Sequence, residues 1–313
     1  MSKTILVLGG LLAAELRSLE GYFKVLKLDK DNHPETVLAE NKDDIVAIIA
    51  TPSKPVSAQL IEALPNLELI TQFGTGTDNI DKEAAAARNI TVTNTPDLVT
   101  ADTADIALLL MLGVARRGFE ADLYVRIGKW MQAPMGLGHT LTGKTAAVLG
   151  MGKIGKAIAK RAAAFDMNVI YNARSKKDDL PYEYCGDIVE MSERADFFIC
   201  AVPGGAETNN IVDAKVLDAI GAGGYLINIA RGSVVDQEAL VVALHNKKLA
   251  GAGLDVYQDE PCVPEGLVKM DNVCLLPHIG TATFETRTKM GQLVVENIRA
   301  HFDGKPVLTP VAA

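Results

Sequence analysis

The sequence predicts an α/β protein with two lobes, each built on a parallel β-sheet covered by helices. Short apolar runs alternate with helix-length segments rich in Ala and Leu, which is typical of parallel strands joined by crossover helices. The runs are apolar throughout, as strands buried on both faces are. We expect strands at residues 45–50, 67–73, 145–149, 168–171, 197–202, 225–229 and 273–276, and helices at 101–116, 154–165, 237–246 and 284–302.

Composition narrows the class of protein. A chain of 313 residues with 48% apolar residues can bury large cores and is neither disordered nor fibrous. Its 31 Lys and Arg against 39 Asp and Glu give a net charge of −8, which argues against nucleic acid and anionic membranes as partners. No apolar stretch approaches the roughly 20 residues of a membrane span. The four cysteines lack a C-x-x-C spacing, so we expect no metal site and a reducing, cytoplasmic location.

A glycine motif follows the apolar run at 145–149 and precedes the helical segment at 154–165. It reads G-M-G-K-I-G, which is the G-x-G-x-x-G fingerprint of a dinucleotide-binding turn in its required setting between strand and helix. The first glycine permits the tight turn, the second lets the backbone approach a pyrophosphate, and the third lets helix and strand pack closely. The alternative is a flexible glycine turn. The cofactor candidates here are Gly150, Gly152, Lys153, Ile154 and Gly155.

The position of this motif, nearly halfway along the chain, predicts the domain organisation. A dinucleotide-binding fold carries the fingerprint after its first strand, so another folded unit must precede it. We expect a substrate domain at 1–98 plus 285–313 and a dinucleotide-binding domain at 99–284, both Rossmann-like or flavodoxin-like. The chain would then cross between the lobes twice. We expect a cleft between them, where small ligands commonly bind.

The end of the second expected strand of the nucleotide-binding lobe points to NADPH. An NAD site usually has Asp or Glu there to hold the ribose 2′-hydroxyl. Here the chain has Arg174, Ser175 and Lys176, and the first acid is Asp178. A guanidinium, a hydroxyl and an ammonium group are the complement of a 2′-phosphate, so NADP is expected and NAD is a weaker possibility. The alternative is a solvated basic loop.

Several ordered motifs together resemble the D-2-hydroxyacid dehydrogenase family over nearly the whole chain. Three of them combine polar residue types with the ends of expected strands, and two more lie in the first lobe. These five motifs are residues 228–232 (N-I-A-R-G), 254–261 (L-D-V-Y-Q-D-E-P), 276–280 (L-P-H-I-G), 72–81 (Q-F-G-T-G-T-D-N-I-D) and 92–96 (V-T-N-T-P). The resemblance implies an NAD(P)-dependent enzyme that reduces a 2-oxoacid to the D-2-hydroxyacid.

The resemblance implies a catalytic set of three residues. His278 would be the acid/base, Glu260 its carboxylate partner and Arg231 the substrate anchor. Reduction of a keto group requires a proton donor at the oxygen, and imidazole titrates near neutral pH. An arginine fork can grip the carboxylate and polarise the keto oxygen. The backbone at Gly74, Thr75 and Gly76 would hold the same carboxylate from the first lobe.

Further family positions carry over to the cofactor site. Asp255 resembles the residue that accepts a hydrogen bond from the nicotinamide carboxamide, and Thr103 and Thr208 resemble residues near the phosphates and ribose. Pro203 would lie against the adenosine. Ile229 and Ala230 would line the nicotinamide ribose.

The resemblance also implies a homodimer, because related chains embrace a second subunit with an arm after the long helix at 101–116. Here that arm contains Trp130, Met131 and Met135. The alternative is that Trp130 packs into its own core.

For the substrate, the basic signature at 174–176 resembles that of NADPH-dependent glyoxylate/hydroxypyruvate and aromatic 2-oxoacid reductases, and we place glyoxylate/hydroxypyruvate first. Phenylpyruvate-type substrates come second, because the expected pocket region around 51–53 has no cation. Two other hypotheses stay open. One is a dinucleotide-sensing protein resembling the corepressor C-terminal binding proteins, which the acidic charge and absence of long polar tails disfavour. The other is a phosphite-oxidising relative, for which Lys54 would be the additional cation.

Overall fold

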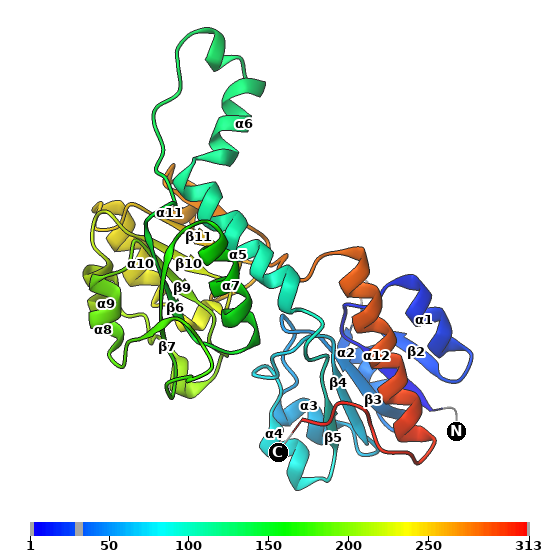
Figure 1. Ribbon diagram of the computed structural model, residues 1–313. Coiled ribbons are helices and arrows are strands. Elements are labelled where there is room, and N and C mark those ends of the chain that lie inside the picture. The colour runs from blue at the N-terminus through cyan, green and yellow to red at the C-terminus, as the bar shows by residue number, and fades with distance from the viewer. Residues whose placement is uncertain (1–2, 29–33, 312–313) are drawn as a thin grey trace. The chain divides into compact units, whose positions relative to one another are not determined.

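A computed structural model describes residues 3–28 and 34–311 of the chain (Figure 1). The chain divides into two compact units, one of Met1–Val99 with Thr281–Ala313 and the other of Thr100–Gly280. The second boundary between the units lies between Gly280 and Thr281. Thr283 caps the helix that follows by accepting a hydrogen bond from the Thr286 amide, and Arg287 in that helix donates to the Thr281 carbonyl at 3.1 Å. Residues 281–283 are thus tied to the first unit.

The first unit has a five-stranded parallel sheet in the order β2-β1-β3-β4-β5. The strand order reverses between β1 and β3, and loops at such a reversal commonly bind ligands. Its strands are β1 (Thr4–Val7), β2 (Lys24–Lys27), β3 (Ile45–Ala50), β4 (Leu69–Gln72) and β5 (Thr91–Thr93). Its helices are α1 (Ala13–Glu20), α2 (Pro34–Asn41), α3 (Ala58–Ala63), α4 (Lys82–Ala87) and α12 (Phe284–Phe302).

The second unit has a seven-stranded parallel sheet in the order β12-β11-β10-β9-β6-β7-β8, with its reversal between β6 and β9. Its strands are β6 (Thr145–Leu149), β7 (Asn168–Asn172), β8 (Glu183–Tyr184), β9 (Phe197–Cys200), β10 (Tyr225–Asn228), β11 (Gly251–Leu254) and β12 (Val273–Leu275). Its α-helices are α5 (Thr100–Ala115), α6 (Gly118–Arg126), α7 (Lys153–Ala164), α8 (Ile188–Glu193), α9 (Ala214–Ile220), α10 (Gln237–His245) and α11 (Glu265–Val268). The 3₁₀ turns are η2 (Lys129–Met131), η3 (Ala206–Thr208) and η4 (Gly232–Val234).

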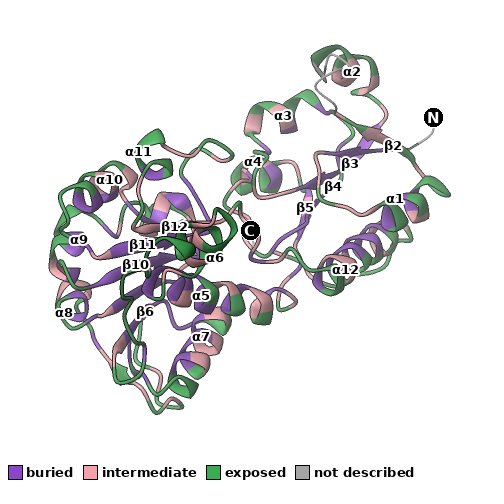
Figure 2. Cartoon of the chain, turned by 90° about the horizontal axis from the view of Figure 1, so that it is seen from above, coloured by how far each residue is buried: buried purple, intermediate pink, exposed green. Residues whose placement is uncertain are grey.

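The central strands are buried on both faces, which explains why their sequences are apolar throughout. Neighbouring residues of β9 show this directly, because Phe197 belongs to one hydrophobic core and Phe198 to another, each at most 1% exposed. Figure 2 shows the central strands of each unit as buried ribbons inside a layer of partly exposed helices. The two predicted parallel-sheet lobes are confirmed.

Helix α6 and η2 form an arm that projects from the body of the second unit (Figure 1). The arm follows α5 and none of its helical residues is buried. Within the part of the chain that the structure describes, no helix is long and apolar enough to cross a membrane.

Candidate active site

The predicted site residues of the second unit, apart from Thr103 in α5, follow the carboxyl ends of six strands of one parallel sheet. Parallel strands end at the same edge, so these loops share that edge. The glycine motif after β6 lies at the reversal between β6 and β9. The residues in order are Gly150 to Gly155 after β6, Arg174 to Lys176 after β7, Pro203 after β9, Ile229 to Arg231 after β10, Asp255 and Glu260 after β11, and His278 after β12.

The three motif glycines differ in whether the fold itself requires them. Gly150 has a φ of +101°, which disfavours any residue with a side chain. A Cβ at Gly155 would collide with the Gly150 carbonyl oxygen. Gly152 has ordinary extended dihedrals, and a Cβ there would meet no protein atom within 4 Å. The fold therefore requires Gly150 and Gly155, whereas Gly152 keeps open a space that the protein itself does not fill.

The amino terminus of α7 opens on the same space. Its cap residue is Gly152, which has no side chain to accept hydrogen bonds from the first helical amides, and Lys153 and Ile154 begin the helix. The amides of a helix's first turn and the helix dipole favour an anion at such a position. The arrangement fits the pyrophosphate of a dinucleotide, and these residues would hold it.

The basic loop after β7 is open to solvent. Arg174, Ser175 and Lys176 are exposed, and the Lys177 ammonium donates to the Ser175 hydroxyl at 3.3 Å. Among the described residues no carboxylate forms an ion pair with Arg174 or Lys176. Two cations and a hydroxyl are thus available to a phosphate, and the chemistry of this set fits NADP.

The predicted pair of His278 and Glu260 forms in the structure. His278 Nδ1 lies 2.6 Å from Glu260 Oε2, and both side chains are largely buried, at 33% and 19% exposed. This contact leaves Nε2 as the ring nitrogen for a substrate. His278 has a φ of +54°, which is unfavourable for a residue with a side chain.

The surroundings of Glu260 keep it ionised. Burial alone would raise its pKa, but the hydrogen bond and charge of His278, the Tyr257 amide at 3.1 Å and the Arg231 guanidinium together hold the pKa below its usual value. The hydrogen bond to Nδ1 orients the imidazole ring and leaves Nε2 for acid/base chemistry.

Arg231 lies in a turn that is fixed from two sides. The Asn228 side chain accepts from the Ala230 amide at 3.0 Å and donates to the Arg231 carbonyl at 2.9 Å. A Cβ at Gly232 would collide with the Tyr257 backbone, so the turn packs directly on the segment that leads to Glu260. These contacts hold Arg231 close enough to Glu260 to lower the pKa of that carboxyl.

Asp255 is 2% exposed and braces the loop that carries His278. Its two carboxylate oxygens accept from the amides of Ile279 and Gly280, each at 2.8 Å. Burial raises its pKa, against the effect of these two amides and of the His278 charge. The hydroxyl of Thr103 donates to the Gly280 carbonyl at 3.4 Å from the start of α5. The structure thus shows both residues in a bracing position, and their contacts with a cofactor remain a prediction.

The other predicted cofactor residues occupy the same edge. Ile229 and Ala230 are buried at 7% and 6% exposed, whereas Pro203 is exposed. The Thr208 hydroxyl donates to the Pro203 carbonyl at 2.6 Å, closing its own loop. The described residues contain no cluster of three or more His, Cys, Asp or Glu suited to a metal.

In the first unit, the predicted substrate loop at residues 74–76 follows β4. The Thr75 hydroxyl donates to the Thr95 carbonyl at 3.1 Å, and the Thr95 amide donates to the Gly74 carbonyl at 2.9 Å. Asn79 joins this loop to the one after β3, because its side-chain amide donates to the carbonyls of Thr51 and Lys54, both at 2.9 Å. The two loops at this edge are therefore held together.

Asn228, Asn79 and Tyr257 also hold the site residues in place, although no role was predicted for them from the sequence. All three lie inside the quoted motifs. The sequence feature that could have indicated such a role is a polar residue in an apolar run. Asn228 is an example, because it ends the apolar strand β10 and is 1% exposed. A buried side-chain amide requires partners, and here they are the backbone groups beside Arg231.

Comparison with known proteins agrees with this geometry. The profile of the D-isomer-specific 2-hydroxyacid dehydrogenase NAD-binding domain matches residues 108–280, more than half of the chain. The chain belongs to the D-isomer-specific 2-hydroxyacid dehydrogenase family. The family resemblance and the oxidoreductase class predicted from the sequence are confirmed.

Individual members of the family are similar over nearly their whole length. Glyoxylate/hydroxypyruvate reductase A of Arabidopsis thaliana is 44% identical over 293 residues, 94% of each chain. Hydroxyphenylpyruvate reductase of Plectranthus scutellarioides is 43% identical over 295 residues, again 94% of each. A solved structure of NADPH-dependent glyoxylate/hydroxypyruvate reductase from Sinorhizobium meliloti, in complex with NADP and malonate, has a TM-score of 0.93 at 39% identity and covers 100% of this chain and 97% of that one.

The lowered pKa of Glu260 predicts a pH-dependent contribution to stability. Because its folded pKa lies below the unfolded value of about 4.3, the carboxylate stabilises the fold above that pH and loses its effect as pH falls through the folded pKa. The variant Glu260→Gln should therefore be less stable than the wild type at pH 7, by on the order of 1 kcal/mol.

Urea unfolding of both proteins between pH 3 and pH 7 measures this difference. We expect the difference in unfolding free energy to shrink toward the acid end. A difference that stays constant over the whole range would contradict the lowered pKa.

Proposed function

We propose that the protein reduces a small 2-oxoacid, glyoxylate or hydroxypyruvate, to the D-2-hydroxyacid with NADPH as the preferred cofactor. The observation that carries the proposal is the His278–Glu260 pair, joined at 2.6 Å beside Arg231, on the same sheet edge as the glycine motif. The names of the similar enzymes support the choice of substrate.

The proposed roles follow from the contacts of each group. NADPH, when bound, supplies the hydride. His278 donates a proton from Nε2 to the keto oxygen, while Glu260 holds Nδ1 protonated and so fixes which nitrogen faces the substrate. Arg231 binds the substrate carboxylate and polarises the keto group through its fork of donors. The backbone of Gly74, Thr75 and Gly76 adds amides for the same carboxylate.

Each proposed cofactor residue is assigned to the part of NADPH that its chemistry fits. The amides at the start of α7 would hold the pyrophosphate, and Arg174, Ser175 and Lys176 would hold the 2′-phosphate. Asp255, Thr103, Pro203, Thr208, Ile229 and Ala230 would line the rest of the cofactor. NAD is expected to bind more weakly, because it offers these cations no phosphate.

A second candidate substrate is an aromatic 2-oxoacid. It is favoured by the 43% identity to hydroxyphenylpyruvate reductase, nearly the same as the identity to the glyoxylate/hydroxypyruvate enzyme. The reaction and the roles of His278, Glu260 and Arg231 are the same for both substrate classes.

Initial rates of cofactor oxidation test the proposal. We expect NADPH with glyoxylate or hydroxypyruvate to give the highest kcat/KM, and NADH to give a lower value because it lacks the 2′-phosphate. Rates highest with hydroxyphenylpyruvate would favour the second candidate. Tight NADPH binding without turnover of any of these oxoacids would contradict the enzyme and favour a dinucleotide-sensing protein, and phosphite-dependent reduction of NADP would favour the phosphite-oxidising alternative.

We further propose that the protein is a homodimer joined through the arm of α6 and η2. The arm and the segment that follows it carry large apolar side chains that are exposed in the single chain, among them Phe119 at 48%, Trp130 at 68%, Met131 at 92% and Leu137 at 95%. Contiguous exposed apolar surface is typical of a protein interface. Trp130 does not pack into the core of its own unit, so the exposed arm favours the dimer over that alternative.

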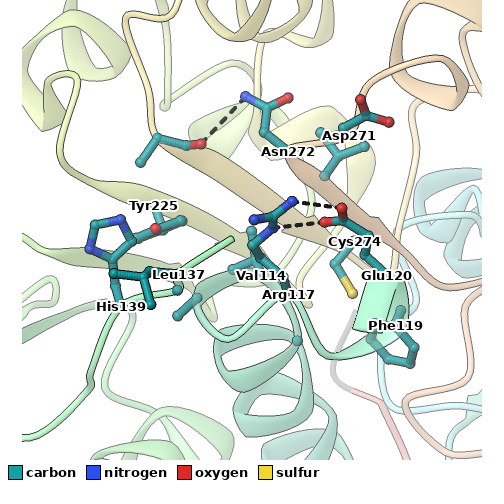
Figure 3. Close-up of a pocket in the computed structure, with 15 residues that line it drawn as sticks. Val114, Arg117, Phe119, Glu120, Leu137, His139, Tyr225, Asp271, Asn272 and Cys274 are labelled. Atoms are coloured by element: carbon teal, nitrogen blue, oxygen red, sulfur yellow. Dashed lines mark hydrogen bonds and ion pairs between the residues drawn. The ribbon is translucent and has the colours of Figure 1, made fainter. Parts of the chain in front are cut away.

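A cavity of about 300 Å³ lies at the root of the arm and adds to this surface (Figure 3). It is lined by apolar groups such as Val114, Phe119 and Leu137, and by the ion pair of Arg117 with Glu120. The cavity borders the amino-terminal ends of β10 and β12, opposite to the edge with the cofactor motif. A second copy seated here would leave the active-site edge accessible.

Sedimentation equilibrium tests the dimer. We expect one species of about twice the 33.4 kDa chain mass, and dissociation of that species in the variant Trp130→Ala with Met131→Ala. A wild-type protein that sediments as a monomer at micromolar concentration would contradict the proposal.

The location we propose is the cytoplasm. All four cysteines are free thiols in the structure, and three of them are buried. Burial raises the pKa of the Cys274 thiol to about 12, so this cysteine is unreactive. Free thiols fit a reducing compartment. Fractionation of the native cells would test this, and recovery in an oxidising compartment would contradict it.

A further inference from the structure

We infer that two tyrosines beneath the basic loop, Tyr171 and Tyr184, are positioning residues for cofactor selectivity. They act by fixing both ends of the loop that carries Arg174, Ser175 and Lys176. This inference rests on the proposed preference for NADPH. Neither tyrosine is assigned a role by the catalytic and cofactor-binding motifs.

Tyr171 holds the far end of the loop. It is fully buried in β7, and its hydroxyl accepts a hydrogen bond from the Lys177 amide at 2.7 Å and donates to the Lys177 carbonyl at 3.3 Å. One hydroxyl thus pairs with both backbone groups of a single residue. The Tyr171 side chain thus ties the far end of the loop, at Lys177, back to strand β7.

Tyr184 holds the near end. It lies directly opposite Tyr171 in the parallel pairing of β8 with β7, and the two rings pack at 5.5 Å between centroids. Its hydroxyl donates to the Ala173 carbonyl at 3.3 Å. The residues on either side of the Arg174–Lys176 segment are therefore anchored, while that segment itself is exposed.

A loop that binds a phosphate needs exposed cations on a backbone that is held in place. Arg and Lys side chains lose conformational freedom when they bind, and a misplaced backbone adds to that cost. A rigid support that holds the cations in place lowers it. The 2′-phosphate is the only part of NADPH that NADH lacks, so loosening the loop should weaken NADPH and leave NADH unaffected.

The variants Tyr171→Phe and Tyr184→Phe test the inference, because phenylalanine keeps the packed ring and removes only the hydroxyl. We expect each to weaken NADPH binding about threefold to tenfold, the usual effect of one or two hydrogen bonds, with NADH binding unchanged. Calorimetric titration with NADPH, NADH and adenosine 2′,5′-bisphosphate measures the effect without turnover.

The matched control is Tyr182→Phe. Tyr182 lies on the same segment and packs against the same core, and its hydroxyl forms no hydrogen bond with any residue that the structure describes. Arg174→Ala is the reference for full loss of the phosphate contact. The control should bind all three ligands as the wild type does.

Three outcomes would overturn the inference, and the last can be told apart from the first two. Equal weakening of NADPH and NADH, or no weakening of either, would show that the tyrosine hydroxyls serve only the stability of the fold. A wild-type protein that binds NADPH and NADH equally would overturn the proposed cofactor preference, and the inference would fall with it.

Discussion

The proposed chemistry depends first on the hydrogen bond between His278 and Glu260. It joins the loop after β12 to the loop after β11, and each loop has its own support. Asp255 braces the histidine loop through two backbone amides, and the Tyr257 amide holds the Glu260 carboxylate. Because both supports come from the sheet edge, the 2.6 Å contact is a property of the fold and not of two flexible side chains.

Three kinds of hydrogen-bond donor lie at the same edge of the second unit's sheet, and each suits a different anion. Backbone amides at the start of α7 suit the pyrophosphate, exposed cations after β7 suit a 2′-phosphate, and the Arg231 guanidinium suits a carboxylate. The chain as a whole is acidic, at −8, so these donors are local features in an acidic protein. Local placement of positive groups selects small anions, whereas a basic surface would attract polyanions.

Much of the fold could be predicted because strands buried on both faces are apolar throughout. The runs at 45–50 and 145–149 match β3 and β6, and the predicted helix at 284–302 matches α12. Strand β11 was not predicted, because its sequence G-A-G-L is short and rich in glycine. Glycine is required at both positions by packing. A Cβ at Gly253 would meet Leu110 of α5 at 2.8 Å, and a Cβ at Gly251 would meet the Asn272 backbone. These contacts exist only after folding.

In the candidate site, the reactive residues could be predicted from sequence motifs, whereas the residues that support them could not. His278, Glu260 and Arg231 were named from ordered motifs, and the structure brings the first two into contact. The bracing groups Asn228, Asn79 and Tyr171 could not be assigned, since their function lies in which backbone groups they reach across 3 to 28 positions of the chain. Sequence patterns report residue types at fixed spacing, whereas support of a loop depends on tertiary geometry.

The most direct test of the central claim is the replacement His278→Ala, with turnover and cofactor binding measured on the same preparation. If His278 delivers the proton, kcat should fall by about 10² to 10⁴, the range that acid catalysis contributes. The dissociation constant for NADPH should stay at the wild-type value, because the pyrophosphate and 2′-phosphate donors are intact. Turnover close to that of the wild type would contradict the account and remove His278 from the mechanism.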